Sequence, residues 1–336
     1  MRDATVGDRL DHYELDELLA RSGMASIFKS TDTLTGQTVV LKVPHFQFES
    51  DVVFHERFKR EENIGTRLDH PYVVKVFTPK YKTRVYLAME FAEGKSLRAI
   101  MDAQRRCPAE FAVDIARQVC EALVYMHSKG VIHRDLKPEN VLVNDDGKIK
   151  ILDFGIALDE AARRLTWTGF SATVGTPTYM APEQINGRRG DVRTDIYALG
   201  MMLFEMVTGE LPFNDSNMHI LMRTKTTEAP LAPSHFMPEI DPGLEEIILH
   251  AIERSPKERY PSADQMLADL RDPTSVTPRD RSQIRASAGF WERIPQTIRT
   301  SAIVLAVISV LCMLIFSTSK KSPRPPSSQT TETRVR

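Results

Sequence analysis

The octapeptide His133-Arg-Asp-Leu-Lys-Pro-Glu-Asn140 decides how the rest of this chain is interpreted. It is followed by Asp153-Phe-Gly155 and by Met180-Ala-Pro-Glu183, and it is preceded by Lys42 within the apolar run Val39-Val-Leu-Lys-Val43. Each piece alone has an ordinary explanation, because Asp-Phe-Gly can form a turn, Ala-Pro-Glu can begin a helix and a strand lysine can face solvent. The pieces together, in this order and at these spacings, make the ordinary explanations implausible.

These strings resemble the catalytic loop, the metal-binding loop and the end of the activation segment of eukaryotic-type (Hanks-type) serine/threonine protein kinases. The resemblance covers about residues 10–271. It implies a bilobal α+β fold, with a small β-rich N-lobe (about 10–92) that carries one main helix and a larger helical C-lobe (about 93–271). It also implies an enzyme that moves the γ-phosphoryl group of Mg-ATP to Ser/Thr hydroxyls of protein substrates, including its own activation segment.

The apolar periodicity also indicates two regions of different type. Short apolar runs typical of strands come first: Ser26–Ser30, Thr38–Val43 and Val85–Phe91. One stretch rich in helix formers, Phe54–Leu68, interrupts them. Longer helical patterns follow from Ser96 onward: Ala109–His127, Asp195–Thr208 and Leu244–Glu253.

Composition and charge exclude several classes of protein. The formal charge is −1 over 336 residues, but from Asp272 onward ten Lys/Arg stand against four Asp/Glu, so the preceding body is acidic and no nucleic-acid partner is expected. The three cysteines, Cys107, Cys120 and Cys312, lack C-x-x-C spacing, which indicates neither a disulfide framework nor a zinc site and fits a reducing cytosol. Because the N-terminal residues are rich in charge, a cleaved signal peptide is not expected.

The resemblance assigns the transfer chemistry to four residues. Asp135 would orient the substrate hydroxyl and accept its proton, with Lys137 next to the γ-phosphate. Lys42 would contact the α- and β-phosphates, and its ammonium needs a carboxylate to hold it. Glu61 is the candidate for that carboxylate, because it lies on the Phe54–Leu68 helix nine residues before His70-Pro71. One residue of helix rotates the adjacent Glu62 by about 100° and would point it elsewhere.

Cofactor binding is expected to need both a metal pair and an adenine pocket. Asn140 and Asp153 supply the hard oxygen ligands suited to Mg²⁺, with Mn²⁺ as an alternative ion. Met89 would close the back of the adenine pocket, although it could equally be core filler. By resemblance, the nucleotide-binding residues are Leu19, Ala20, Ser22, Gly23, Ala25, Ile27, Val40, Lys42, Met89, Glu90, Ala92 and Leu142.

The phosphate-covering loop departs from the family pattern. That pattern is G-x-G-x-x-G, and here Ala20, Ser22 and Ala25 replace its three glycines, leaving Gly23 at the tip. The replacements should stiffen the loop and weaken ATP binding. Val40 narrows the adenine pocket, and Gly65 loosens the helix that carries Glu61.

These departures keep a second hypothesis open, a membrane-tethered pseudokinase scaffold with weak or no ATP turnover. A scaffold has no chemical need for a complete base and metal set. The retained set therefore favours the enzyme: Lys42, Glu61, Asp135, Asn140 and Asp153.

Further residues resemble parts of the activation machinery. Lys137 together with Gly175-Thr176 resembles the serine/threonine branch, and Arg134 would pair with a phosphorylated residue of the activation segment. The candidate phosphoacceptors are Thr166, Thr168, Ser171 and Thr173. Glu183 and Arg259 resemble a structural ion pair of the family, and Asp195 resembles the acid that braces the catalytic loop, unless it is a helix N-cap.

The segment Thr300–Ser319 predicts a membrane anchor. Its twenty residues carry no charge, and at about 1.5 Å per residue they would form about 30 Å of helix, enough for a bilayer core. A juxtamembrane linker (272–299) precedes it and a short disordered tail (320–336) follows. We expect a single-pass protein of a bacterial inner membrane, with a cytosolic kinase domain that can form a homodimer and phosphorylate in trans.

Overall fold

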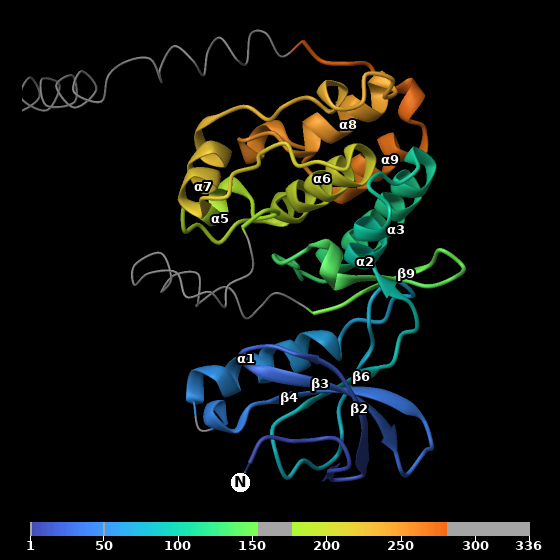
Figure 1. Ribbon diagram of the computed structural model, residues 1–336, viewed down its shortest axis with the longest axis vertical. Coiled ribbons are helices and arrows are strands. Elements are labelled where there is room, and N and C mark those ends of the chain that lie inside the picture. The colour runs from blue at the N-terminus through green and yellow to red at the C-terminus, as the bar shows by residue number, and fades with distance from the viewer. Residues whose placement is uncertain (1, 50, 154–176, 281–336) are drawn as a thin grey trace, which may run out of the picture. The chain divides into compact units, whose positions relative to one another are not determined.

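The structure is a computed structural model, and it describes residues 2–49, 51–153 and 177–280. Residues 1–279 group into one compact unit. The first part of this unit is a sheet that carries one long helix, and the second part is mainly helical (Figure 1). The two-lobed α+β fold expected from the sequence is therefore confirmed.

The N-lobe is built on a twisted antiparallel sheet. Among the described residues it has six strands in the order β1-β2-β3-β4-β6-β5. Their bounds are β1 (Arg9–Leu10), β2 (Tyr13–Arg21), β3 (Ala25–Asp32), β4 (Thr38–Pro44), β5 (Val76–Phe77) and β6 (Leu87–Glu90). In β4 the residues Val39, Leu41 and Val43 are buried in one apolar cluster, so the alternation of a strand turns Lys42 to the opposite face.

Helix α1 (Val52–Gly65) follows the 3₁₀ turn η1 (Phe46–Phe48) and belongs to a second core. Phe58 of α1 packs in the same cluster as Leu87 and Met89 of β6. Glu61 lies three residues further on, hence on the same side of the helix. Gly65 is the last residue of α1, so its missing side chain affects the helix end and not its middle.

The C-lobe contains a small sheet and a set of packed helices. Its three-stranded antiparallel sheet runs in the order β7 (Lys95–Ser96), β8 (Val141–Val143) and β9 (Ile149–Ile151). The described helices are α2 (Leu97–Ala103), α3 (Ala109–Ser128), α5 (Pro182–Ile185), α6 (Val192–Thr208), α7 (Met218–Thr227), α8 (Pro242–Ala251) and α9 (Ala263–Arg271). Four short 3₁₀ turns connect them: η2 (Pro138–Asn140), η4 (Pro233–His235), η5 (Pro256–Glu258) and η6 (Pro273–Ser275).

Helix α6 is the centre of the C-lobe. It packs against α3, α8 and α9, and almost all of its residues are buried. A Cβ atom on Gly200 would lie 2.6 Å from the Cβ of Ala251, so glycine is needed for the close approach of α6 to the end of α8. A helix enclosed on several sides is apolar nearly all round, which explains the strongly apolar sequence of this segment.

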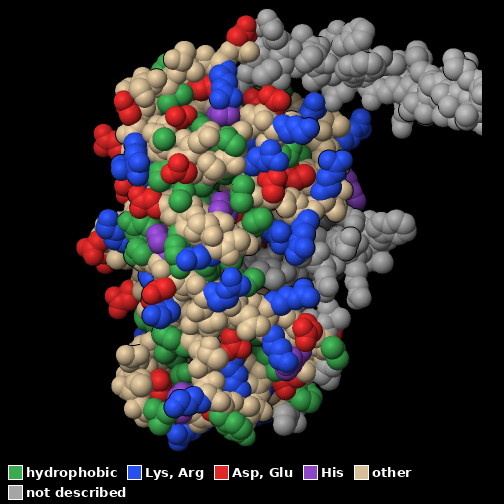
Figure 2. Space-filling view, turned by 180° about the vertical axis from the view of Figure 1, so that it is seen from behind, with side chains coloured by type: hydrophobic (Ala, Val, Ile, Leu, Met, Phe, Trp, Pro, Cys, Tyr) green, Lys and Arg blue, Asp and Glu red, His purple; other side chains and the backbone are tan. Residues whose placement is uncertain are grey.

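Ordered contacts continue beyond both ends of the 10–271 range. Near the N-terminus the Asp3 carboxylate accepts a hydrogen bond of 2.8 Å from the Phe46 backbone N–H. Near the C-terminus the Arg279 backbone N–H donates to Glu246 of α8 at 3.0 Å. Acidic and basic side chains are interspersed over the face of the molecule that Figure 2 shows.

The expected anchor and tail lie outside the described residues. This holds for Thr300–Ser319, for 320–336 and for most of the linker. Within the described part of the chain, no helix is both long enough and apolar enough to cross a bilayer.

Candidate active site

Lys42 joins carboxylates that come from both lobes. Its Nζ atom lies 2.9 Å from Glu61 Oε1 and 2.9 Å from Asp153 Oδ1. The exposed fraction of the side chain is 18% for Lys42, 6% for Glu61 and 37% for Asp153. The ammonium from β4 therefore ties helix α1 to Asp153, which lies two residues after strand β9 of the C-lobe.

The charges of this triad depend on one another. Burial alone would lower the pKa of Lys42, but the carboxylates of Asp153 and Glu61 outweigh burial and raise it. Burial raises the pKa of Glu61, and the neighbouring Asp153 charge adds to the rise. For Asp153, burial is outweighed by the attraction of Lys42, so its pKa is lowered. Of the two carboxylates, the more exposed Asp153 is therefore the one whose anionic form is favoured.

Helix α1 distinguishes its two adjacent glutamates as expected. Glu62 forms an ion pair of 2.6 Å with Lys82 and takes no part in the Lys42 triad. Lys82 in turn donates to the Tyr86 carbonyl. The rotation of about 100° between neighbouring helical residues accounts for this separation.

Two residues of the octapeptide, Lys137 and Asn140, converge on the carboxylate of a third, Asp135. Lys137 Nζ lies 2.8 Å from Asp135 Oδ2. Asn140 Nδ2 donates to the Asp135 carbonyl at 2.8 Å and to its carboxylate at 3.2 Å. The turn η2 brings Asn140 back towards Asp135, and the Asn140 carbonyl accepts from Leu152 N at 2.8 Å, which links the loop to the residue before Asp153.

Asp195 braces this loop from α6. Its fully buried carboxylate accepts from the backbone N–H groups of His133 and Arg134 at 2.9 and 2.8 Å, and from His127 Nε2 at 2.9 Å. Arg134 has a left-handed backbone with φ of 63°, a strained conformation that these bonds stabilise. The N-cap of α6 is Asp191, so the brace and not the cap is the structural place of Asp195.

The donor set for a divalent cation is one carboxylate and one amide. Because Asn140 uses its Nδ2 atom towards Asp135, its Oδ1 atom is the one that would hold a metal ion, together with the carboxylate oxygens of Asp153. Among the described residues no cluster of three or more His, Cys, Asp or Glu side chains has metal-binding geometry. A sparse oxygen set still fits Mg²⁺, which usually takes one or two carboxylates and completes its shell with phosphates and water.

The register of the sheet collects the expected nucleotide residues. Directly paired residues share a face, and the pairs Ala20↔Ile27, Ile27↔Lys42 and Val40↔Met89 place these side chains together. Met89 is buried with the core, while Val40 is half-buried. The β4 face that bears Lys42 is therefore continuous with the residues expected near adenine.

The other residues expected to line the adenine pocket differ in their burial and hydrogen bonds. The Glu90 N–H donates to the Lys75 carbonyl at 2.9 Å, and its carboxylate accepts from Lys75 N and from Lys150. The backbone carbonyl of Glu90 is the group expected to accept a hydrogen bond from adenine. Ala92 and Leu142 are half-buried, and Leu19 is exposed.

The glycine-poor loop closes on its own serine. Ser22 N donates to the Ala25 carbonyl at 2.9 Å, and Ser22 Oγ accepts from the N–H groups of Ala25 at 3.1 Å and Met24 at 3.3 Å. Backbone N–H groups are what such loops offer to phosphate. A glycine could not make these side-chain bonds, so Ser22 ties down a turn that the family pattern leaves free.

The Glu183–Arg259 pair expected from the sequence is present. Two guanidinium nitrogens of Arg259 lie 2.8 Å from the two oxygens of Glu183, and Thr194 Oγ1 donates to the same carboxylate at 2.9 Å. Burial would raise the pKa of Glu183, but Arg259 outweighs burial and lowers it. The pair fixes α5 to the late part of the C-lobe.

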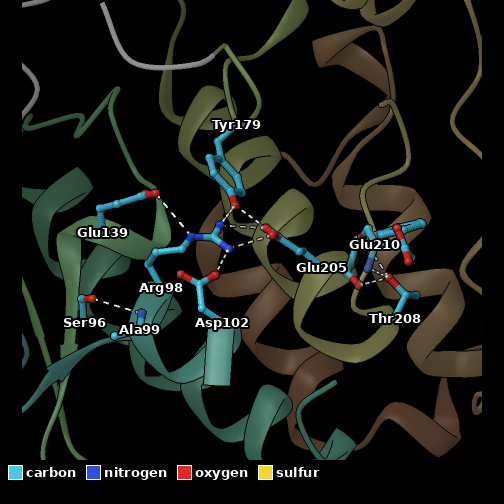
Figure 3. A network of polar contacts seen from close by, with 10 residues as sticks. Ser96, Arg98, Ala99, Asp102, Glu139, Tyr179, Glu205, Thr208 and Glu210 are labelled. Carbon is cyan, nitrogen blue, oxygen red and sulfur yellow. Dashed lines mark hydrogen bonds and ion pairs between the residues drawn. The ribbon is translucent and has the colours of Figure 1, made fainter. Parts of the chain in front are cut away.

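Arg98 of α2 is a residue that the sequence analysis missed. It pairs with Glu205 of α6 at 2.9 Å and with Glu139 of the octapeptide at 3.4 Å, and it donates to the Tyr179 hydroxyl (Figure 3). The local sequence offered one hint of ion pairing at Arg98, the acidic Asp102 four residues later. In the structure the two side chains lie 3.3 Å apart. Arg98 thereby connects the catalytic loop to the stretch before Ala181-Pro-Glu183.

The expected phosphoacceptors cannot be placed relative to this site. Thr166, Thr168, Ser171 and Thr173 lie outside the described residues. The pairing of Arg134 with one of them stays a prediction.

A two-lobed fold in which a lysine–glutamate pair faces an Asp/Asn catalytic loop defines the protein kinase class. The profile of the protein kinase domain matches residues 13–270, and the chain belongs to this family. It is 37% identical over 271 residues to a probable serine/threonine-protein kinase PknB of Corynebacterium glutamicum, an alignment that covers 77% of this chain and 42% of that protein. It is 34% identical over 265 residues to the serine/threonine-protein kinase PknB of Mycolicibacterium smegmatis, with coverage of 77% and 42%.

The chain thus spans less than half the length of these curated relatives. Among solved structures, the PknI kinase domain of Mycobacterium tuberculosis superposes with a TM-score of 0.63 over 80% of this chain and 99% of that domain. The sequence identity is 24%, so this likeness concerns the fold.

The two neighbouring glutamates of α1 provide a matched test of the triad. We expect Glu61→Gln to lower kcat/KM for ATP by about 10- to 100-fold, because it removes the charge that holds Lys42. Glu62→Gln makes the same chemical change one residue away and should alter kcat/KM by less than about twofold. Equal losses in steady-state kinetics of the two variants would contradict the assignment of Glu61.

Proposed function

We propose that this chain is a serine/threonine protein kinase that transfers the γ-phosphoryl group of Mg-ATP to protein hydroxyls and phosphorylates its own activation segment. The observation that carries the proposal is the convergence of Lys137 and Asn140 on Asp135, beside a Lys42 that bridges Glu61 and Asp153. The names of the bacterial relatives support the same activity.

The proposed mechanism uses these groups for positioning and charge. Asp135 accepts a hydrogen bond from the substrate hydroxyl, orients its oxygen and takes its proton as the new O–P bond forms. The bond between the γ-phosphorus and the β–γ bridging oxygen breaks in the same transfer, and ADP leaves with that oxygen. Lys137 and Lys42 face the phosphates as cations, which offsets the repulsion between anions brought into line. Mg²⁺ held by Asp153 and Asn140 would neutralise phosphate charge.

The alternative, a membrane-tethered scaffold without turnover, rests on the substituted loop at Ala20, Ser22 and Ala25. The loop lies over phosphates and carries no group that reacts. Its expected effect therefore falls on nucleotide affinity and not on the chemical step. The intact bonding around Asp135 favours the enzyme over the scaffold.

Substitution of the proposed base tests the activity. Asp135→Asn should lower autophosphorylation by about 10²- to 10⁴-fold, because the amide cannot accept the proton. The melting temperature should stay near that of the parent. Asp145→Asn, at an exposed turn position, is the matched control and should keep full activity. Undiminished incorporation of labelled phosphate in Asp135→Asn would remove the assignment, and an inactive parent chain would favour the scaffold.

Restoring the glycines tests what the loop does. The triple change Ala20→Gly, Ser22→Gly and Ala25→Gly frees the N–H groups of Met24 and Ala25 from the Ser22 hydroxyl. We expect KM for ATP to fall by about 3- to 10-fold while kcat changes by less than about twofold. Initial rates at varied ATP measure both parameters. A parent KM that is already low and does not respond to the glycines would show that the loop does not limit binding.

We also propose that Thr300–Ser319 anchors the enzyme in a membrane with the kinase domain in the cytosol. The support is the uncharged composition of this segment and the cytosolic supply of ATP and Mg²⁺ to the site. A tether raises the effective concentration of the enzyme towards membrane-bound substrates and towards a second copy, which favours phosphorylation in trans.

Charge placed in the segment tests the anchor. The full chain should stay with membranes through an alkaline carbonate wash, and protease added to spheroplasts should leave the kinase domain intact. Two arginines at the centre, Leu305→Arg with Val310→Arg, should release it, since each costs about 2.5–3.5 kcal/mol there. Ser328→Arg outside the segment should not. A parent chain recovered in the soluble fraction would exclude the anchor, and digestion of the kinase domain from outside would exclude the orientation.

A further inference from the structure

Lys225 of helix α7 is buried completely, although long charged side chains seldom are. Its exposed fraction is 1%. The Nζ atom donates to the Pro177 carbonyl at 3.1 Å and also to the Thr178 carbonyl. The amino group of Lys225 is therefore occupied by hydrogen bonds to two consecutive backbone carbonyls of another segment.

The surroundings of this amine favour hydrogen bonding over ion pairing. Lys225 Nζ lies 5.2 Å from the centroid of the Tyr197 ring, and the Arg259 guanidinium lies 4.7 Å from the same centroid. Among the described residues Lys225 forms no ion pair with a carboxylate. Burial and the nearby Arg259 lower the pKa of Lys225 well below its usual range.

The carbonyls belong to the sequence Gly175-Thr-Pro-Thr-Tyr-Met-Ala-Pro-Glu183, which resembles the peptide-binding segment of protein kinases. Pro177 and Thr178 are buried, and they lead through Tyr179 into helix α5. Helix α5 lies beside α7 (Figure 1). The side chains of this stretch thus rest on the C-lobe, and its backbone shape depends on what its carbonyls meet.

Two anchors of different kind hold this stretch. On one side the Tyr179 hydroxyl meets Arg98 and Glu205, and Arg98 reaches Glu139 of the catalytic loop (Figure 3). On the other side Lys225 holds the carbonyls before Tyr179. The first anchor relates the stretch to the catalytic loop, and the second sets its path along α7.

We propose that Lys225 is a positioning residue for the protein substrate, holding the 177–178 backbone in the shape that receives the polypeptide around the target hydroxyl. It acts through that backbone and does not touch the reacting atoms. The part of the inference that concerns substrate rests on the proposed kinase function, whereas the hold of Lys225 on the segment does not.

Replacement of a basic side chain by methionine at two sites of α7 tests the inference in the full chain. Lys225→Met keeps an unbranched apolar stem of similar length but loses the donors. Arg223→Met, on an exposed position two residues away, is the matched control. Hydrogen exchange at residues 178–181 reports the hold on the segment. Steady-state kinetics with a generic basic protein and ATP report the substrate effect.

For Lys225→Met we expect faster exchange at 178–181 and a rise of about tenfold in KM for the protein substrate, with KM for ATP changed by less than about twofold. Arg223→Met should leave all three unchanged. Should Lys225→Met fail to fold, Lys225→Gln takes its place: its NH₂ group sits on a shorter stem and holds the carbonyls less well, so exchange at 178–181 should be faster and KM for the protein substrate higher than in the parent, with KM for ATP unchanged.

Two outcomes would overturn the inference. One is unchanged exchange at 178–181 in a folded Lys225 variant. The other is a parallel rise in KM for ATP and for the protein substrate, which indicates a general loss of structure. If the parent chain transfers no phosphate, the proposed function fails by itself, and the exchange comparison alone still decides whether Lys225 holds the segment.

Discussion

A single ammonium group shared by two carboxylates is the constraint on which the site depends. Lys42 cannot satisfy Glu61 and Asp153 together unless strand β4, helix α1 and the end of the small C-lobe sheet stand in one arrangement. Removing the cation would leave the nearly enclosed Glu61 with an uncompensated charge, which is costly in a buried place. The arrangement of β4, α1 and the end of the small sheet and the charge state of Asp153 therefore depend on the same ammonium group.

Much of this arrangement could be predicted from local sequence. The apolar pattern predicted the strand at Thr38–Val43 and the helices at Ala109–His127 and Asp195–Thr208. Helix α6 begins three residues earlier than predicted, at Val192, after its N-cap Asp191. The choice of Glu61 followed from its place nine residues before His70-Pro71, and helical rotation then set the adjacent Glu62 aside. The boundaries differ by a few residues because capping and tertiary packing, not periodicity, determine where an element ends.

Arg98 and Lys225 could not be found in the same way. Their partners lie far away in sequence: Glu205 for Arg98, and Pro177 and Thr178 for Lys225. A lysine among polar neighbours on α7 predicts a solvent-facing side chain, and only tertiary burial turns it inward. The loop at Ser22 could be predicted only in part. The sequence shows that the glycines are missing, but it does not show that the Ser22 hydroxyl forms hydrogen bonds that restrict the loop.

Helix α6 has a consequence for how the C-lobe can open. Asp195 near its start supports the catalytic loop, Tyr197 faces both Lys225 and Arg259, and Glu205 near its end holds Tyr179. All of these contacts are made by one helix that is buried along nearly its whole length. Local opening needs exposed, weakly packed structure, and α6 offers little of it. The catalytic loop and the stretch after residue 176 should then lose protection together, as one cooperative unit whose opening free energy approaches that of the whole lobe.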